Sequence, residues 1–178
     1  MKNLLLILIT SFTLSCCEKD NQSKPIAEID KLPPATQIGA NTVGCLLDGK
    51  AFKPGSYNNS TNCFYQYVSG EYFFILGFGN EDAKFNLTAL AIGTRKREIN
   101  KGEIYDLLEY EDGNAYGRYS YNAVTPTATS HNYTGKLTIT KLDRVNGIVS
   151  GTFWFDVEDQ EGVVHRIRDG RFDMHYTN

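Results

Sequence analysis

The sequence predicts an all-β protein: a single antiparallel β-sandwich of about 8–10 strands, with a β-barrel as the alternative and little or no helix. The chain of 178 residues contains 11 Tyr, 10 Phe and 16 Gly, a composition typical of aromatic-rich strands joined by tight turns. Short alternating apolar and polar runs are separated by turn signals about every eight to twelve residues, the spacing expected of a sandwich or barrel.

The first half of the folded part predicts two hairpins. Residues 43–54 read "VGCLLDGKAFKP", in which Asp48-Gly49 supplies the two positive φ angles of a type I′ turn. Residues 63–79 read "CFYQYVSGEYFFILGFG" and turn at Ser69-Gly70. The next strand has apolar residues on both faces, which indicates a central strand that is covered on both sides.

The second half predicts further strands and one unassigned polar loop. The best candidate for a helix is a single turn near residues 81–84. Gly162 is the expected positive-φ residue of the last turn, and either Phe153 or Trp154 should anchor the core from the strand before it. The expected strands cover residues 85–93, 104–109, 115–122 and 134–143 and the closing hairpin 146–176, and the polar loop covers 123–132.

The N-terminus has the features of an export signal. Lys2 precedes a short apolar run, which is too short to span a bilayer as a helix. The stretch "TLSCCEKD" then resembles the lipobox of bacterial lipoproteins, which implies that Cys16 is lipidated; the alternative is Cys17, for which Leu14 fits the pattern. More than one acyl chain gives lasting membrane attachment. A secreted protein with a chance cysteine pair is the competing interpretation.

These features divide the chain into three parts. The acidic residues Glu18 and Asp20 resemble the export signal of surface lipoproteins in the Bacteroidetes group. The proline-containing stretch "QSKPIAEIDKLPPAT" shows no clear period and is expected to be extended or disordered. We therefore expect a signal peptide at 1–15, a lipidated N-terminus and flexible tether at 16–36, and a β-sandwich domain at 37–178.

Composition and motifs argue against several activities. The net charge of −3 and the single basic cluster "RKRE" do not fit a nucleic-acid surface. The sequence contains no G-x-S-x-G, H-E-x-x-H or C-x-x-C motif. Cys45 and Cys63 lie in the folded part of an exported chain and form a possible disulfide, which would stabilise by about 3 kcal/mol; two buried free thiols are the alternative.

Histidines and carboxylates give no clear site. His165 shares a face with Val163 and Ile167, so an inward-pointing, hydrogen-bonded histidine is expected rather than a metal ligand. His175 approaches it only if Gly170 forms a hairpin rather than a bulge. The acidic turn at 156–161 reads as a solvated turn rather than a calcium loop. We expect no metal site and no cofactor.

Tyrosines are the one feature that indicates a ligand. Their number exceeds what a small core easily hides, and exposed rings on β-sandwiches stack against sugars or protein partners. A tyrosine-rich strand surface without a ligand is the simpler interpretation. The candidate ligand platform consists of Tyr65, Tyr67, Tyr116, Tyr119 and Tyr121.

Longer stretches resemble a family of Bacteroidetes lipoproteins of unknown function. The resemblance covers about residues 32–176 and is strongest in "TQIGANTVGCLLDG" and in the "SGTF…GRFD" end. It implies an all-β domain behind a lipoprotein signal peptide, and it implies no activity and no catalytic residue.

We therefore expect a lipid-anchored lipoprotein of the outer membrane, periplasmic or surface-exposed, with a non-enzymatic binding or structural role. The alternative is a carbohydrate-binding accessory lipoprotein of a glycan-uptake system, and a hydrolase with paired carboxylates is the weakest candidate. The expected partners are the membrane, through the N-terminal lipid, and a glycan or an envelope protein, without nucleic acid.

Overall fold

The computed structural model describes residues 25–57 and 60–178 and shows an all-β domain. Eleven strands form one open, mixed sheet, and the described part of the chain contains one short 3₁₀ helix, η1 (Glu28–Lys31). The strands are β1 (Thr42–Leu47), β2 (Lys50–Phe52), β3 (Thr61–Val68), β4 (Glu71–Glu81), β5 (Leu87–Thr94), β6 (Ile104–Leu107), β7 (Ala115–Tyr121), β8 (Thr127–Ala128), β9 (Gly135–Asp143), β10 (Ile148–Glu158) and β11 (Val164–His175).

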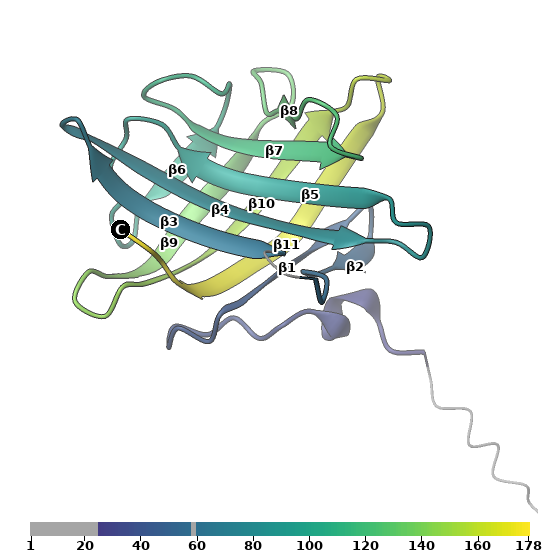
Figure 1. Ribbon diagram of the computed structural model, residues 1–178, viewed down its shortest axis with the longest axis horizontal. Helices are drawn as coiled ribbons and strands as arrows, with labels where there is room; N and C mark the ends of the chain where they lie inside the picture. The colour runs from purple at the N-terminus through teal and green to yellow at the C-terminus, as the bar shows by residue number, and fades with distance from the viewer. Residues whose placement is uncertain (1–24, 58–59) are drawn as a thin grey trace, which may run out of the picture.

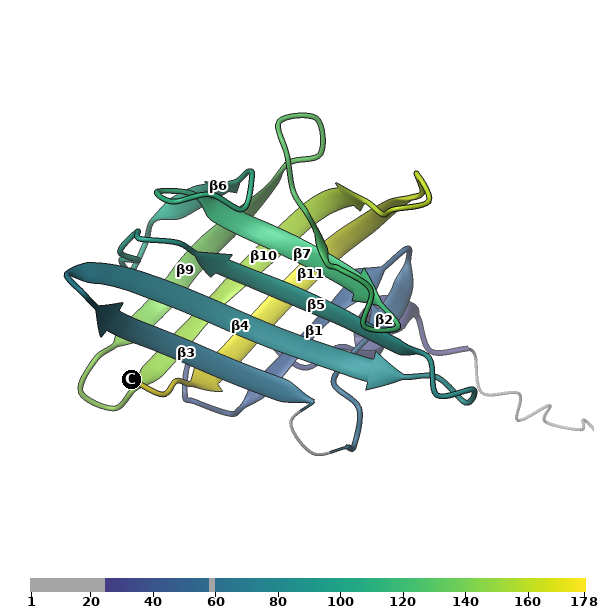
Figure 2. The ribbon, with the colours of Figure 1, turned by 45° about the horizontal axis from the view of Figure 1, so that its top comes forward.

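The sheet folds over itself into two layers, which gives the sandwich-like architecture (Figure 1). Its strand order is β2-β1-β11-β10-β9-β6-β7-β5-β4-β3, with β8 paired to β7. The strands β3, β4, β5 and β7 form the front layer and cross the strands of the back layer at an angle (Figure 2). The short strand β6 pairs with β9 of the back layer and with β7 of the front layer, so it joins the two layers along one side.

The C-terminal residues join the layers again at the free edge of β3. The backbone N–H of Tyr65 donates to the carbonyl of Thr177, and the N–H of Thr177 donates to the carbonyl of Cys63, both at 3.0 Å. Thr177 and Phe64 thereby form a parallel bridge just beyond the end of β11. The sheet order itself stays open, because the terminal strands of that order are β2 and β3.

Aromatic rings from both layers fill the core. Phe74 of β4 lies against Phe172 of β11 with ring centroids 6.2 Å apart, and Phe78 of β4 lies against Phe153 of β10 at 6.3 Å. Phe153 is therefore the core anchor, whereas Trp154 faces outward and is partly exposed. This packing supplies the apolar burial that holds the layers together.

Close packing against a ring requires glycine at position 170. A Cβ atom there would lie 2.5 Å from the Phe153 ring and 2.6 Å from the Phe153 carbonyl oxygen, which is closer than atoms pack. The strand bends at the same place, because Asp169 has a positive φ and the β10–β11 register shifts between Phe153 and Phe155. Position 170 therefore combines a β-bulge with the Phe153 ring packed directly against the backbone.

The two predicted turns are confirmed. Asp48 and Gly49 have φ angles of 49° and 79°, and Ser69 and Gly70 have 53° and 88°. Each pair joins two antiparallel strands, as expected for turns with two positive φ angles. Gly162 also has the expected positive φ, at 80°.

Two details of the predicted fold are corrected. There are eleven strands rather than 8–10, because the two-residue strand β8 lies within the polar stretch that was expected to be a loop. The sheet is mixed rather than purely antiparallel, because β6 runs parallel to β7 at the Leu107–Ala115 pair. Neither a two-residue strand nor a parallel junction leaves a periodic pattern in the sequence.

A buried carboxylate ties the segment before β1 to the back layer. Asp173 of β11 is fully buried, and its two oxygens accept hydrogen bonds from the N–H groups of Ile38, Gly39 and Ala40 at 2.8–3.1 Å. The Thr36 hydroxyl donates at 2.6 Å, and the Ser150 hydroxyl donates at 2.8 Å. Three successive N–H groups on one carboxylate form an anion-binding nest.

These hydrogen bonds set the ionisation of Asp173. Burial alone would raise its pKa, but the bonds from Thr36, Ile38, Ala40 and Ser150 outweigh burial and hold the pKa well below its usual value. The two stretches that carried the family resemblance therefore meet at one carboxylate, since Thr36–Ala40 belongs to the first and Ser150 and Asp173 belong to the second.

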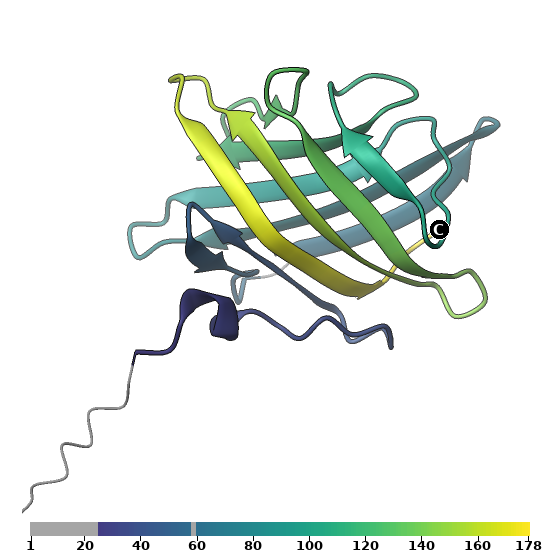
Figure 3. The ribbon, with the colours of Figure 1, turned by 180° about the vertical axis from the view of Figure 1, so that it is seen from behind.

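The described part of the expected tether lies along the domain (Figure 3). In η1, the Glu28 carboxylate accepts a hydrogen bond from the N–H of Ala51 in β2 at 2.9 Å, and Leu32 is buried. The expected signal peptide and both candidate lipidation sites, Cys16 and Cys17, lie outside the described residues. Within the described residues, no helix is long and apolar enough to cross a membrane.

Candidate functional site

One cavity lies where the β7–β8 loop faces the β10–β11 turn, and we call it the His165 cavity. Its volume is about 530 Å³. Its walls come from the end of β7, the following loop, β8, the β10–β11 turn and the start of β11; in Figure 1 these elements meet at the upper right. The lining residues are Tyr119–Tyr121, Val124, Thr125, Thr127, Asp159–Glu161, Val163 and His165.

His165 is held on three sides. Its ring stacks on Tyr119 of β7, with centroids 4.1 Å apart and planes at 22°. Its Nδ1 lies 2.8 Å from Oδ2 of Asp48 in the β1–β2 turn, and its Nε2 lies 3.3 Å from Oδ2 of Asp159 in the β10–β11 turn. The expected inward-pointing, hydrogen-bonded histidine is confirmed, although it stands at the start of β11 rather than in the middle of a strand.

Both flanking carboxylates are fixed by backbone N–H groups, Asp159 within its own turn and Asp48 from β11. Asp159 Oδ1 accepts hydrogen bonds from the N–H groups of Glu161 and Val163, each at 2.9 Å. The bond from Val163 and the contact with His165 lower the pKa of Asp159. Asp48 Oδ1 accepts from the N–H of Arg166 at 2.8 Å. Asp159 therefore stays ionised at neutral pH, and both aspartates hold the imidazole at the cavity wall.

The opposite wall offers an exposed ring and polar groups. Tyr121 is 44% exposed. The Gln160 side-chain amide donates to the carbonyl of Thr125 at 2.9 Å and so links the two loops. The buried hydroxyl oxygen of Thr127, a lining residue, has no hydrogen-bond partner within the structure. An apolar surface with a few convergent polar groups is typical of a ligand site.

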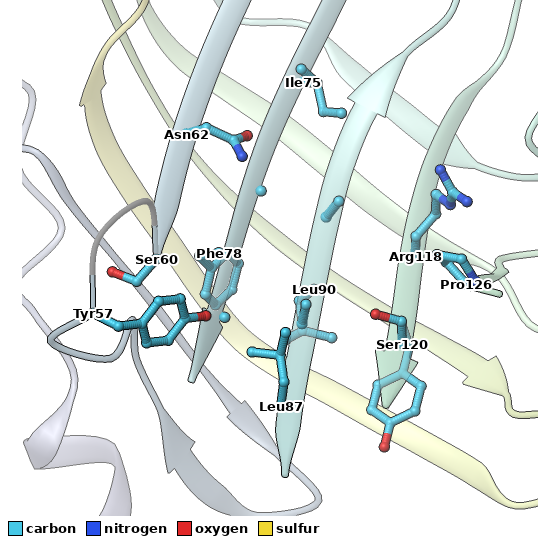
Figure 4. Close-up of a pocket in the computed structure, with 15 residues that line it drawn as sticks. Tyr57, Ser60, Asn62, Ile75, Phe78, Leu87, Leu90, Arg118, Ser120 and Pro126 are labelled. Carbon is cyan, nitrogen blue, oxygen red and sulfur yellow. The ribbon is translucent and has the colours of Figure 1, made fainter. Parts of the chain in front are cut away.

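A second hollow of about 330 Å³ lies on the outer face of the front layer (Figure 4). Tyr57 and Arg118 stand at opposite sides of this hollow, and Ile75 and Leu87 lie between them. Its floor consists of small residues of β4 and β5: Gly77, Gly79, Ala89 and Ala91. β5 therefore lies inside the sheet, between β4 and β7, but the expected cover on both faces is wrong: one face meets the core and the other lines this shallow hollow.

The predicted tyrosine platform is wrong. Tyr65 and Tyr119 are buried in the core, and Tyr116 is buried on the other face of β7, where its ring meets that of Tyr110 edge-on. The two exposed members, Tyr67 and Tyr121, lie at opposite ends of the front layer. Tyr67 pairs with Tyr72 beside the β3–β4 turn, whereas Tyr121 pairs with Thr88 at the far end of β5. These five rings therefore form no common surface.

The structure instead gathers a different set of tyrosines into a cavity of about 410 Å³, which we call the tyrosine cavity. Tyr67 is 64% exposed, and its ring centroid lies 4.7 Å from that of Tyr72. Tyr65 stacks on Tyr72 and meets Tyr176 edge-on. The guanidinium of Arg144 lies 5.7 Å from the centroid of Tyr72 and 5.8 Å from that of Tyr65.

The predicted disulfide between Cys45 and Cys63 is absent. Both are buried free thiols, on strands β1 and β3, which are not neighbours in the sheet. Burial raises the pKa of both thiols, that of Cys63 to about 12. Neither sulfur therefore has the thiolate character that a nucleophile needs.

His165 and His175 lie far apart, because β11 runs through Gly170 as one bulged strand. The third histidine, His131, contacts Glu109 on the surface. Across residues 25–57 and 60–178, no group of three or more His, Cys, Asp or Glu side chains could hold a metal ion.

Sequence reasoning found His165 but not its partners. Asp48 and Asp159 were interpreted only as turn residues, and Tyr119 only as part of a platform. The sequence did contain a signal. Asp48 and Asp159 each stand in a turn between two strands, and His165 stands near the start of the strand that follows the second turn. The pairing order of β1 and β11, which brings the two turns together, was the missing information.

The fold and cavity define a class: a two-layer all-β domain with a small-molecule-sized cavity at one end of the sheet. No protein-family model, curated protein or solved structure matches the chain.

Proposed function

We propose that this protein is a non-enzymatic binding module, held by an N-terminal lipid at the outer membrane, that takes a small ligand in the His165 cavity. The observation that carries the proposal is the cavity itself. Its volume of about 530 Å³ lies within the range of natural small-molecule sites. Its walls are held by hydrogen bonds between elements, so the cavity is formed before a ligand arrives.

The ionisable groups favour binding over catalysis. Across the described residues, every carboxyl group with a shifted pKa has a lowered one, including Asp159 in the cavity. A glycoside hydrolase needs a carboxylic acid whose pKa is raised. The buried thiols of Cys45 and Cys63 also have raised pKa values, which is unfavourable for nucleophilic attack.

The cavity is tested by ligand screening with a matched pair of variants. The full chain in detergent is titrated with sugars, amino acids, amines and carboxylates while the backbone NMR signals of the cavity residues are followed. Val124→Trp places a large ring at the cavity wall, and Val145→Trp places the same ring at a fully exposed turn. We expect a ligand to shift the cavity signals, Val124→Trp to abolish the shift, and Val145→Trp to leave it unchanged. No response to any compound class would contradict the proposal.

The lipid anchor rests on the "TLSCC" stretch and is tested separately. Cells grown with an alkyne-labelled fatty acid should label the wild-type protein, and Cys16→Ala should abolish the label. Loss of label only in Cys17→Ala would move the site to Cys17, and an unlabelled wild type would refute the anchor.

A carbohydrate-binding accessory role is the second candidate, and the tyrosine cavity is the observation that favours it. The exposed ring of Tyr67 is available for stacking on a sugar, and Arg144 lies close enough to donate hydrogen bonds to hydroxyl groups. A glycan array with the full chain tests this role. Binding that is lost in Tyr67→Ala and kept in Tyr121→Ala would support it, and silence across the array would remove it for the sugars tested.

A further inference from the structure

We propose that the His165 cavity selects an organic cation, an ammonium group held between aromatic faces and carboxylates. The inference rests on the proposed binding function and adds the chemical class of the ligand. Two features carry it, the charge of the lining and the aromatic surfaces, and the effect of the same carboxylates on a buried phenol agrees with the first.

The charge of the cavity is negative in either protonation state of its histidine. Asp159 and Glu161 line the cavity, and Asp48 contacts the lining residue His165. No Lys or Arg is found among the described lining residues. Even with the imidazole protonated, three carboxylates and one imidazolium leave a net charge of −2. A cavity of one sign concentrates ligands of the other sign.

Tyr119 reports this potential from the cavity wall. Burial raises the pKa of its hydroxyl, and the nearby charges of Asp159, Asp48 and Glu161 raise it further. All the charged groups that act on this phenol are acidic. An anionic ligand would meet the same repulsion as a phenolate, whereas a cation would be attracted.

The aromatic surfaces suit an alkylated ammonium group better than a bare metal ion. Tyr119 forms one wall as a stacked pair with His165, and Tyr121 stands nearby with 44% of its surface exposed. Ring faces attract cations electrostatically, because the face of an aromatic ring carries partial negative charge. The cavity volume of about 530 Å³ also exceeds the space that a single ion occupies.

Three isosteric probes test the inference: choline, neutral 3,3-dimethylbutan-1-ol and anionic 3,3-dimethylbutanoate. They have similar shapes and differ mainly in charge. Each is titrated into the full chain while the NMR signals of Tyr121, Thr127, Gln160 and His165 are followed. We expect choline to bind about tenfold more tightly than the alcohol, and the anion to bind most weakly.

Matched variants locate the effect. Glu161→Gln removes one charge from the lining and should weaken choline about threefold without affecting the alcohol. Tyr121→Leu removes a ring and should weaken choline two- to fivefold. Glu111→Gln and Tyr110→Leu make the same changes at exposed positions outside the cavity and should leave binding unchanged.

Each outcome decides the inference. Tighter binding of choline, sensitive to both cavity variants and to added salt, supports it. Equal or tighter binding of the alcohol or the anion at the same signals overturns the charge selectivity and leaves the proposed binding function standing. No shift of cavity signals with choline also overturns the inference, and the wider ligand screen then decides the proposed function by itself.

Discussion

Replacing Asp173 by Asn tests how strongly the buried carboxylate holds the segment before β1. The substitution keeps the shape of the side chain but exchanges one acceptor oxygen for an N–H₂ donor. If the amide oxygen takes the place of Oδ2, the bonds from Thr36, Ile38 and Ala40 remain. The N–H of Gly39, which donates to Oδ1 at 2.8 Å, then faces another donor and loses its partner.

The expected loss follows from these contacts. A buried donor left without a partner costs about 1–3 kcal/mol, and the remaining bonds lose their charge assistance. We therefore expect Asp173→Asn to lower the free energy of unfolding by about 2–4 kcal/mol. For a domain of this size that corresponds to a fall in Tm of roughly 5–15 °C. Urea unfolding followed by fluorescence and far-ultraviolet dichroism measures it.

Asp169→Asn is the matched control on the same strand. Asp169 is exposed and has a φ of 52°, a conformation that Asn also tolerates, so its replacement should change the free energy of unfolding by less than about 0.5 kcal/mol. A loss below about 1 kcal/mol in Asp173→Asn would refute the reasoning.

The remaining predictions concern acid stability, core packing and the thiols. The folded-state pKa of Asp173 is lowered below 3.8, so its stabilising effect is present above that pH and is lost as the pH falls further. In Asp173→Asn the urea midpoint should therefore fall less steeply between pH 5 and pH 2 than in the wild type. An equally steep fall in both proteins would contradict this. Gly170→Ala should lower the free energy of unfolding by about 1–3 kcal/mol, because the new Cβ meets the Phe153 ring. The loss should be smaller when Phe153→Leu is also present, and a double-mutant cycle that shows no coupling between the two positions would disprove the packing argument. Cys45 and Cys63 should resist a thiol reagent in the native protein and react in urea, and a reductant should leave the Tm unchanged; a reductant-sensitive Tm would indicate a disulfide.

Local chemistry explains which features were predictable from the sequence. The turns at Asp48-Gly49 and Ser69-Gly70 depend on backbone conformations that few residue types adopt, so neighbouring residues suffice to predict them. The same holds for β9, where the alternation of apolar and polar residues predicts which side chains face the core.

The site depends on pairings that are distant in sequence, and these were not predictable. Alternation shows that Tyr119 and Tyr121 share a face, but it does not show that Tyr119 packs on His165 of another layer. A carboxylate in "GRFD" gives no sign that it will accept four hydrogen bonds from a segment more than 100 residues away and a fifth from Ser150 of the neighbouring strand. The cysteine spacing likewise contains no information on the distance between β1 and β3.

The bridge between Thr177 and β3 affects how copies of this protein meet one another. An open sheet offers its border strands to neighbouring chains, which is a common route to aggregation. Here the Thr177 backbone already occupies Cys63 and Tyr65 in the middle of β3, and the opposite border, β2, is only three residues long. Shortening the chain by its last two residues should therefore make the protein more prone to self-association, although it removes nothing from the core.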